Sequence, residues 1–121
     1  MRAVLAGAGL ALLALAHPVS AQEAAQQAAR KPLVIPQEAG ARQGRVVGRA
    51  ILCGVAPERV DALLRSRREA MQRAVGVALT QERYVLALND AIAFETSLPK
   101  PEAPAFCETA LAGFAALETG E

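Results

Sequence analysis

The chain has 121 residues, a formal net charge of +1, one histidine, two cysteines and 3% aromatic residues. This length allows one small domain, and the near-neutral charge with few aromatic side chains excludes nucleic acid as an expected partner. The excess of arginine over lysine, 11 to 2, is typical of GC-rich coding DNA and favours a bacterial source.

Residues 1–21 have the three-part pattern of a secretory signal peptide. Arg2 supplies the positive charge, an apolar run follows, and small residues precede the expected cleavage between Ala21 and Gln22. The apolar run is shorter than the roughly 20 residues that cross a bilayer as a helix. We therefore expect cleavage rather than a retained anchor, no stable membrane insertion afterwards, and a periplasmic or secreted mature chain.

The next segment, residues 22–41, is predicted to be a flexible N-terminal arm. It is rich in glutamine and alanine and is interrupted by Pro32 and Pro36. The first helix of the domain, residues 42–121, is expected from about Arg42 to Val55, where apolar residues recur every three or four positions. Two glycines in this helix, Gly44 and Gly48, would let a neighbouring helix approach closely.

Three further helices are expected in chain order: 57–76, about 80–98 and about 105–117. Pro57 suits the first position of a helix, and Thr80 is an acceptable N-cap. If the second and third helices were one continuous helix, their apolar residues would lie on different faces of it. This mismatch predicts a break between Gly76 and Thr80. The resulting prediction is an all-α fold, a small four-helix up-down bundle closed by one disulfide.

The disulfide is predicted between Cys53 and Cys107. In an up-down bundle, the end of the first helix and the start of the fourth lie at the same level, and both cysteines fall on apolar faces. Export would place them in an oxidising compartment, where disulfides persist. The alternatives are two buried free thiols or a redox-active pair, although no second cysteine lies two residues from either one, as a redox motif would require.

Charge is divided between the two halves of the mature chain. Residues 22–75 hold ten positive and five negative charges, which gives +5, whereas residues 76–121 hold two positive and seven negative charges, which gives −5. Opposed halves attract each other within one fold or between copies. The basic run 65–73 is interpreted as a solvated helix face, with an acidic partner or anionic headgroups as alternative ligands.

Two charged residues fall in the middle of predicted apolar faces, Arg67 on the second helix and Glu95 on the third. Because an unpaired buried charge is costly, one hypothesis is an ion pair between them. Their axial levels differ by roughly 9 Å at 1.5 Å per residue. The alternatives are that both side chains extend to the edge of the bundle, or that they form a ligand or partner site.

The expected function is non-catalytic. The single histidine, His17, is removed with the signal peptide, which removes imidazole-based catalytic and metal sites. No catalytic, cofactor or metal residues are predicted. The protein is expected to be a binding or structural module that contacts another periplasmic protein or itself. The alternative is a periplasmic stress protein with chaperone-like activity, because the predicted architecture is similar to that of periplasmic acid-stress chaperones, which are small, helical and carry one disulfide.

Overall fold

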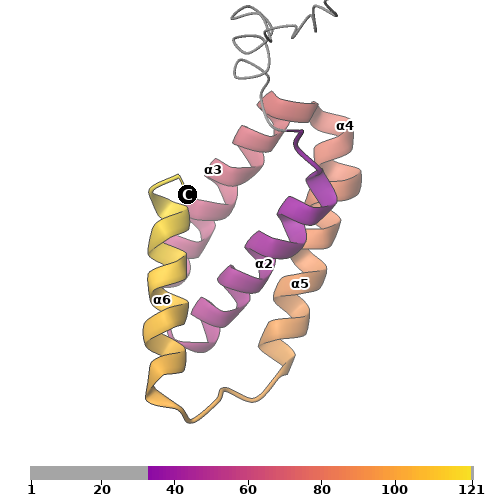
Figure 1. Ribbon diagram of the computed structural model, residues 1–121. Coiled ribbons are helices and arrows are strands. Elements are labelled where there is room, and N and C mark those ends of the chain that lie inside the picture. Colours follow the sequence, from indigo (N-terminus) through magenta and orange to yellow (C-terminus); the bar gives the residue numbers. More distant parts are fainter. Residues whose placement is uncertain (1–32, 121) are drawn as a thin grey trace, which may run out of the picture. The chain divides into compact units, whose positions relative to one another are not determined.

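The computed structural model of the protein describes residues 33–120, and every regular element in this range is helical (Figure 1). The predicted signal peptide, its cleavage site at Ala21 and Gln22, and residues 22–32 of the predicted arm lie outside the described residues. None of the described helices is both long enough and apolar enough to cross a membrane.

The helices follow one another in an up-down order. In Figure 1, the first and third run in one direction and the second and fourth return in the other. The third helix consists of a short α-helical turn, a π-helical turn and a longer α-helix, so the predicted four-helix up-down bundle is confirmed. The elements are α2 (Pro36–Leu52), α3 (Pro57–Val75), α4 (Val77–Leu79), the π-helical η1 (Thr80–Val85), α5 (Leu86–Ser97) and α6 (Pro104–Glu118).

Three helices begin with a proline, at Pro36, Pro57 and Pro104. Proline is favourable at the first helical position because its fixed φ suits the helix and its missing N–H would have no intrahelical partner. The start at Pro57 confirms the prediction. The predicted start of the first helix at Arg42 is wrong: residues 36–41, assigned to the arm, form its first turns, because Pro36 starts a helix instead of interrupting one.

The break after α3 lies at Gly76, as predicted. Gly76 has a φ of 90°, a conformation that residues with a β-carbon rarely adopt. The predicted N-cap at Thr80 is wrong, because the chain re-enters the helix immediately, at Val77. Thr80 lies inside the continuing helix and is buried, and its hydroxyl donates a hydrogen bond to the Gly76 carbonyl oxygen over 2.6 Å.

The closest helix pair in the domain is α2 and α5. Gly40, Gly44 and Gly48 lie four residues apart on one face of α2, and all three are buried. A β-carbon at Gly44 would lie 2.5 Å from the Leu88 carbonyl oxygen, and one at Gly48 would lie 2.6 Å from the Glu95 β-carbon. The glycines therefore bring the two backbones together, as predicted for Gly44 and Gly48.

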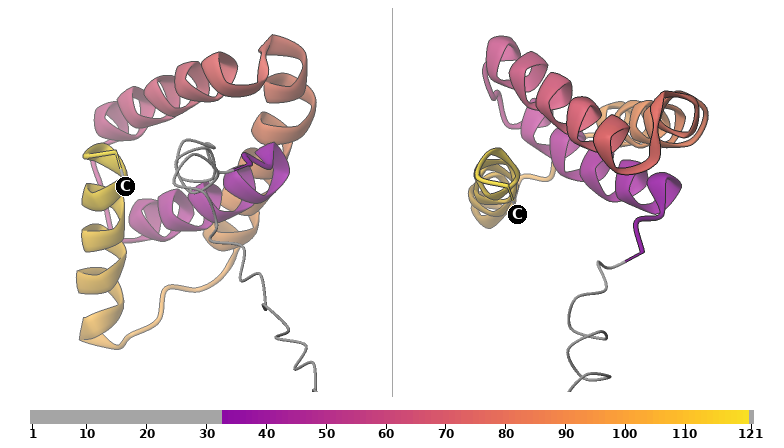
Figure 2. Two further views of the ribbon diagram at one scale, coloured as in Figure 1. Left: turned by 45° about the horizontal axis from the view of Figure 1, so that its top comes forward. Right: turned by 90° about the horizontal axis from the view of Figure 1, so that it is seen from above.

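Two apolar clusters fill the space between the helices. One gathers at the end of α2 that bears the disulfide and includes Val47, Leu63 and Phe114. The other lies near the start of α2 and includes Met71, Tyr84 and Leu88. The apolar face of α3 contributes to both clusters, with Leu63 in the first and Met71 in the second; Figure 2 shows the course of α3 from two further directions.

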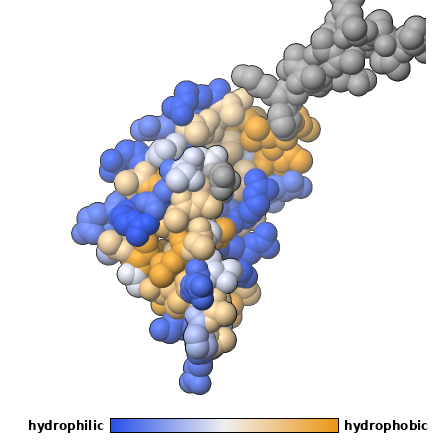
Figure 3. All heavy atoms as spheres, turned by 60° about the vertical axis from the view of Figure 1, so that its left-hand side comes forward, coloured by the Kyte–Doolittle hydropathy of each residue, from blue (hydrophilic) through white to orange (hydrophobic). Residues whose placement is uncertain are grey.

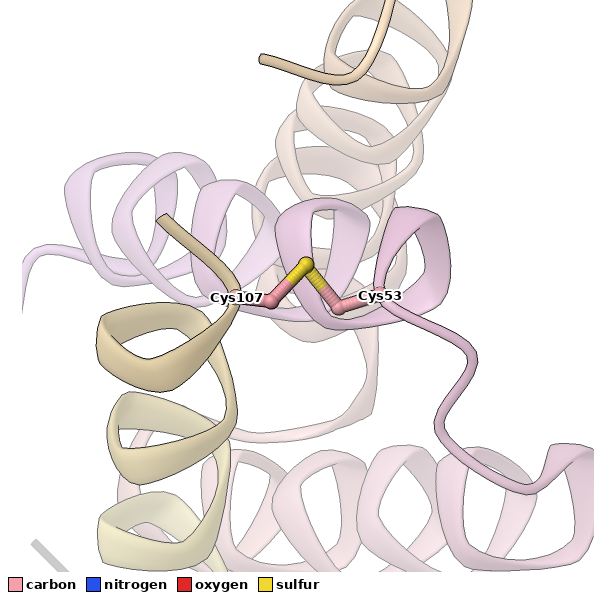
Figure 4. Close-up of a disulfide and its surroundings, with 2 residues drawn as sticks. All are labelled: Cys53 and Cys107. Atoms are coloured by element: carbon pink, nitrogen blue, oxygen red, sulfur yellow. A yellow bond between two sulfur atoms is a disulfide. The ribbon is translucent and has the colours of Figure 1, made fainter. Parts of the chain in front are cut away.

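The disulfide joins Cys53, directly after α2, to Cys107 in the first turns of α6 (Figure 4). The two α-carbons lie 5.4 Å apart, inside the range that a disulfide spans, and neither cysteine is free. The predicted pairing is therefore confirmed, and the alternative of two free thiols is wrong. The bond holds α6 against the end of α2 after the proline-containing connector.

Candidate functional site: a groove between α2 and α5

A groove of about 480 Å³ lies between α2 and the η1–α5 segment. One side is a row of α2 residues spaced four apart: Gln37, Ala41 and Arg45. The other side is formed by residues of η1 and α5: Glu82, Arg83, Leu86, Ala87, Asp90, Ala91 and Phe94. The groove therefore follows the two helices side by side, a shape that suits an extended or helical ligand.

Small side chains form the groove because they line the edge of the α2–α5 contact. Ala87 and Ala91 approach the glycine face of α2 so closely that β-carbons at Gly40 and Gly44 would lie 3.2 and 2.7 Å from their β-carbons. Because alanine side chains are short, no side chain of the described helices fills the space above this contact. The groove is a consequence of the same small residues that bring the two helices together.

Two large apolar side chains stand at this groove without cover from the described residues. Leu86 is 60% exposed and Phe94 is 62% exposed. Figure 3 shows a different view of the surface, in which hydrophobic residues lie in patches between hydrophilic ones. Single exposed apolar residues are ordinary, but two large ones that line the same hollow as Ala41, Ala87 and Ala91 are a feature of interaction sites.

Four charged residues line the groove: Arg45, Arg83, Glu82 and Asp90. The ion pairs among the described residues are Arg49–Glu95 and Arg59–Glu118, so none of the four is in an ion pair. The groove therefore combines an apolar floor with two positive and two negative groups that make no ion pair within residues 33–120.

The hypothesis of an Arg67–Glu95 ion pair is wrong. Glu95 is buried and accepts a hydrogen bond from Arg49 Nε at 3.4 Å. The Glu95 side chain starts beside Gly48, since a β-carbon at that glycine would lie 2.6 Å from the Glu95 β-carbon. Arg49 is the next residue along α2. Arg67 instead donates a hydrogen bond to the carbonyl oxygen of Leu117, in the last turn of α6, where a positive charge is favourable to the helix dipole.

A buried tyrosine belongs to the second apolar cluster. Tyr84 is fully buried, and its hydroxyl donates a hydrogen bond to Gln43 Oε1 over 2.6 Å. Burial raises the pKa of Tyr84, and the positive charge of Arg67 partly opposes that rise. The phenol of Tyr84 stays protonated at neutral pH, and its hydrogen bond to Gln43 joins η1 to α2.

Tyr84 is the only tyrosine, and the chain has no tryptophan, so absorbance reports its ionisation alone. We expect it to titrate above the ordinary value of about 10. Its pKa is raised on folding, so its contribution to stability is complete at neutral pH and is lost as pH rises above about 10. Replacing Tyr84 by Phe should cost about 1–2 kcal/mol, because Gln43 loses its partner. Titration of the folded protein at the ordinary value would contradict this account.

The C-terminal turn of α6 is held by Arg59 of α3. The Arg59 guanidinium lies 5.3 Å from the centre of the Phe114 ring and pairs with the Glu118 carboxylate, with Nε 3.2 Å from Oε2. The hydrogen bond from Arg59 is the main cause of the lowered pKa of Glu118. Arg59 therefore combines a cation–π contact with an ion pair across the helices.

This ion pair predicts an acid-dependent contribution to stability. Because folding lowers the pKa of Glu118, its contribution is present above the ordinary carboxyl pKa of about 4.3 and is lost as pH falls below it. We expect Glu118→Gln to reduce the fall in melting temperature between neutral and acidic pH. Glu108→Gln, an exposed change on the same helix, should leave that fall unchanged, and equal effects of the two variants would contradict the prediction.

The groove residues were not predicted as a site. Gln37 and Ala41 were assigned to the flexible arm, and Leu86 and Phe94 lay outside the apolar face assigned to the third helix. A usable signal was present, because two large apolar side chains stood on the side of that helix opposite its predicted core. Among the described residues, no group of three or more histidine, cysteine, aspartate or glutamate side chains could hold a metal ion.

The groove as described is suited to binding. It offers an apolar floor for side chains of a partner and charges of both signs for hydrogen bonds or ion pairs. Comparison of the chain with protein-family models, with curated proteins and with solved structures gave no match.

Proposed function

We propose that this protein is an exported, non-catalytic binding module, periplasmic or secreted, that contacts its partner through the α2–α5 groove. The observation that carries the proposal is the groove itself, about 480 Å³ in volume, with Leu86 and Phe94 exposed at its edge. Its four charged residues are outside every ion pair of the described residues. An apolar surface edged by polar and charged groups is the usual composition of a protein interface.

Two observations support export. The first is the signal-peptide pattern of residues 1–21. The second is the Cys53–Cys107 disulfide, because such bonds form and persist in oxidising compartments and are rare in the cytosol. The disulfide also suits a binding module, since it ties α6 to the end of α2, one of the two sides of the groove.

Site-specific photo-cross-linking in the producing cells tests the proposal. A photoreactive residue at Phe94 should give a discrete cross-linked product, whereas the same residue at exposed Ser66 of α3 should give none. The product should disappear when Ala41→Trp fills the groove, in a variant whose circular dichroism and melting temperature show that it still folds. Equal cross-linking from both positions, or a product unaffected by the filled groove, would contradict the proposal.

A second candidate, chaperone-like activity under acid stress, is favoured by the chemistry of the two ion pairs. Both depend on carboxylates, Glu95 and Glu118, which bind arginines of other helices. Acid neutralises carboxylates and leaves arginines charged, which would loosen the packing and expose apolar surface. Dye binding at about pH 3 should then exceed that at neutral pH, together with suppression of client aggregation. Unchanged dye binding would remove this candidate.

A further inference from the structure

We propose that the partner in the α2–α5 groove is a second copy of this chain, bound through a two-fold contact in which the α5 helices run antiparallel. This inference rests on the proposed function, because it names the occupant of the same groove. The evidence for a second copy is the set of charged residues in the groove and the order of these residues along η1 and α5.

The balance of charges selects among classes of partner. The groove is lined by two arginines and two carboxylates, and none of them is in an ion pair of the described residues. An acidic peptide or an anionic lipid surface would meet the carboxylates, and a basic peptide would meet the arginines, so each would face like charges. A second copy carries the same charges, and an antiparallel contact can place Arg83 of each copy opposite Asp90 of the other.

The order of the charges gives the register of the contact. Arg83 precedes Asp90 by two helical turns, with Leu86 and Ala87 midway between them. If a two-fold axis passes between Leu86 and Ala87, Arg83 of each copy lies opposite Asp90 of the other. The two ion pairs then flank a central contact in which Leu86 of one copy meets Ala87 of the other. A two-fold interface of this kind uses one surface twice.

The apolar side chains fit the same register. Phe94 lies one further turn from the axis, and in an antiparallel contact its level matches that of Leu79 in the other copy. Both are exposed, Phe94 at 62% and Leu79 at 47%. The contact would therefore cover Leu86 and Phe94 of each copy, the two large apolar residues that line the groove.

The interface is small, so the dimer is expected to be weak and reversible. Sedimentation equilibrium of the purified, disulfide-bonded full chain, from about 1 to about 500 µM, should show a monomer–dimer equilibrium. Arg83→Asp and Asp90→Arg should each weaken the dimer by about tenfold or more, because each places like charges opposite each other. The double variant, Arg83→Asp with Asp90→Arg, should restore dimerisation, since the opposed pairs are formed again with reversed sign.

Glu108→Arg, an exposed charge reversal on α6, a helix that does not line the groove, is the matched control and should not change the dimer. A wild-type chain that stays monomeric over the whole range overturns the proposal. So does a dimer that Phe94→Asp disrupts while the two charge reversals leave it unchanged, because that result would place a different register in the groove.

The test also separates this proposal from the proposed function. A monomer that still gives the groove-dependent cross-link from Phe94 would retain the binding function and reject self-association. If removal of residues 22–31 converts a monomeric wild type into a dimer, the chain's own N-terminal segment occupies the groove, and the proposal is also rejected.

Discussion

Replacement of Cys53 by serine is expected to lower the melting temperature by on the order of 15–30 °C. The Cys53–Cys107 bond closes a loop with a sequence separation of 54 residues. The chain-entropy relation gives about 4 kcal/mol for a loop of that size. That is a large fraction of the roughly 5–15 kcal/mol by which a domain is typically stable. Thermal denaturation followed by circular dichroism gives the measurement.

Two further variants control for effects other than the lost bond. Cys107→Ser and the double Cys53→Ser, Cys107→Ser variant should melt close to the single variant, because each removes the same cross-link. Reduction of the wild-type protein should have the same effect without any change in sequence. A melting temperature unaffected by reduction would show that the bond does not stabilise the domain.

The second large effect is expected from Gly44→Ala. The new β-carbon would lie 2.5 Å from the Leu88 carbonyl oxygen and 2.7 Å from the Ala91 β-carbon. Neither α5 atom can move without shifting the helix backbone, so α2 and α5 must separate. We expect a loss of about 3 kcal/mol or more, at the upper end of the range for an overfilled core, despite the higher helix propensity of alanine.

Gly113→Ala on α6 is the matched control. A β-carbon there would have only an ordinary contact, 3.6 Å from Val46 Cγ1, and alanine favours the helix interior by about 1 kcal/mol over glycine. The same substitution should therefore stabilise the protein at position 113 and destabilise it at position 44. Urea denaturation of both variants measures the two changes, and a loss of equal size at both positions would contradict the close α2–α5 contact.

The helices and the disulfide followed from local sequence patterns. Apolar spacing, Pro57 and Gly76 gave the second helix its limits, and the cysteine positions gave the pairing once the helix directions were fixed. These features depend on neighbours in the chain, or on the simple alternation of helix directions. The all-α bundle was predictable for that reason.

The errors concern features that depend on packing between helices. Gly40 was missed as part of the glycine face because Pro36 was interpreted as a break instead of a helix start. The π-helical turn inserts a residue that no spacing rule shows. Glu95 was assigned the wrong partner because a helical wheel gives the face of a residue but not which neighbouring helix lies against that face.

The groove was hidden for a related reason. Its two sides come from segments distant in the chain, and the closeness of α2 and α5 depends on three glycines of which only two were placed in a helix. Phe94 and Leu86 were visible in the sequence as apolar residues off the predicted core face. That these two residues line a groove could be seen only once the position of α2 beside α5 was known.

Both proposals depend on an exported domain closed by its disulfide, and the form of the protein recovered from the producing cells tests this claim most directly. Fractionation, thiol labelling without reduction and peptide mass spectrometry are applied to the same sample. The account predicts a chain in the periplasmic or secreted fraction that begins at Gln22, resists labelling, and yields a peptide in which Cys53 is linked to Cys107. A chain that stays in the cytosol with both cysteines labelled would contradict it.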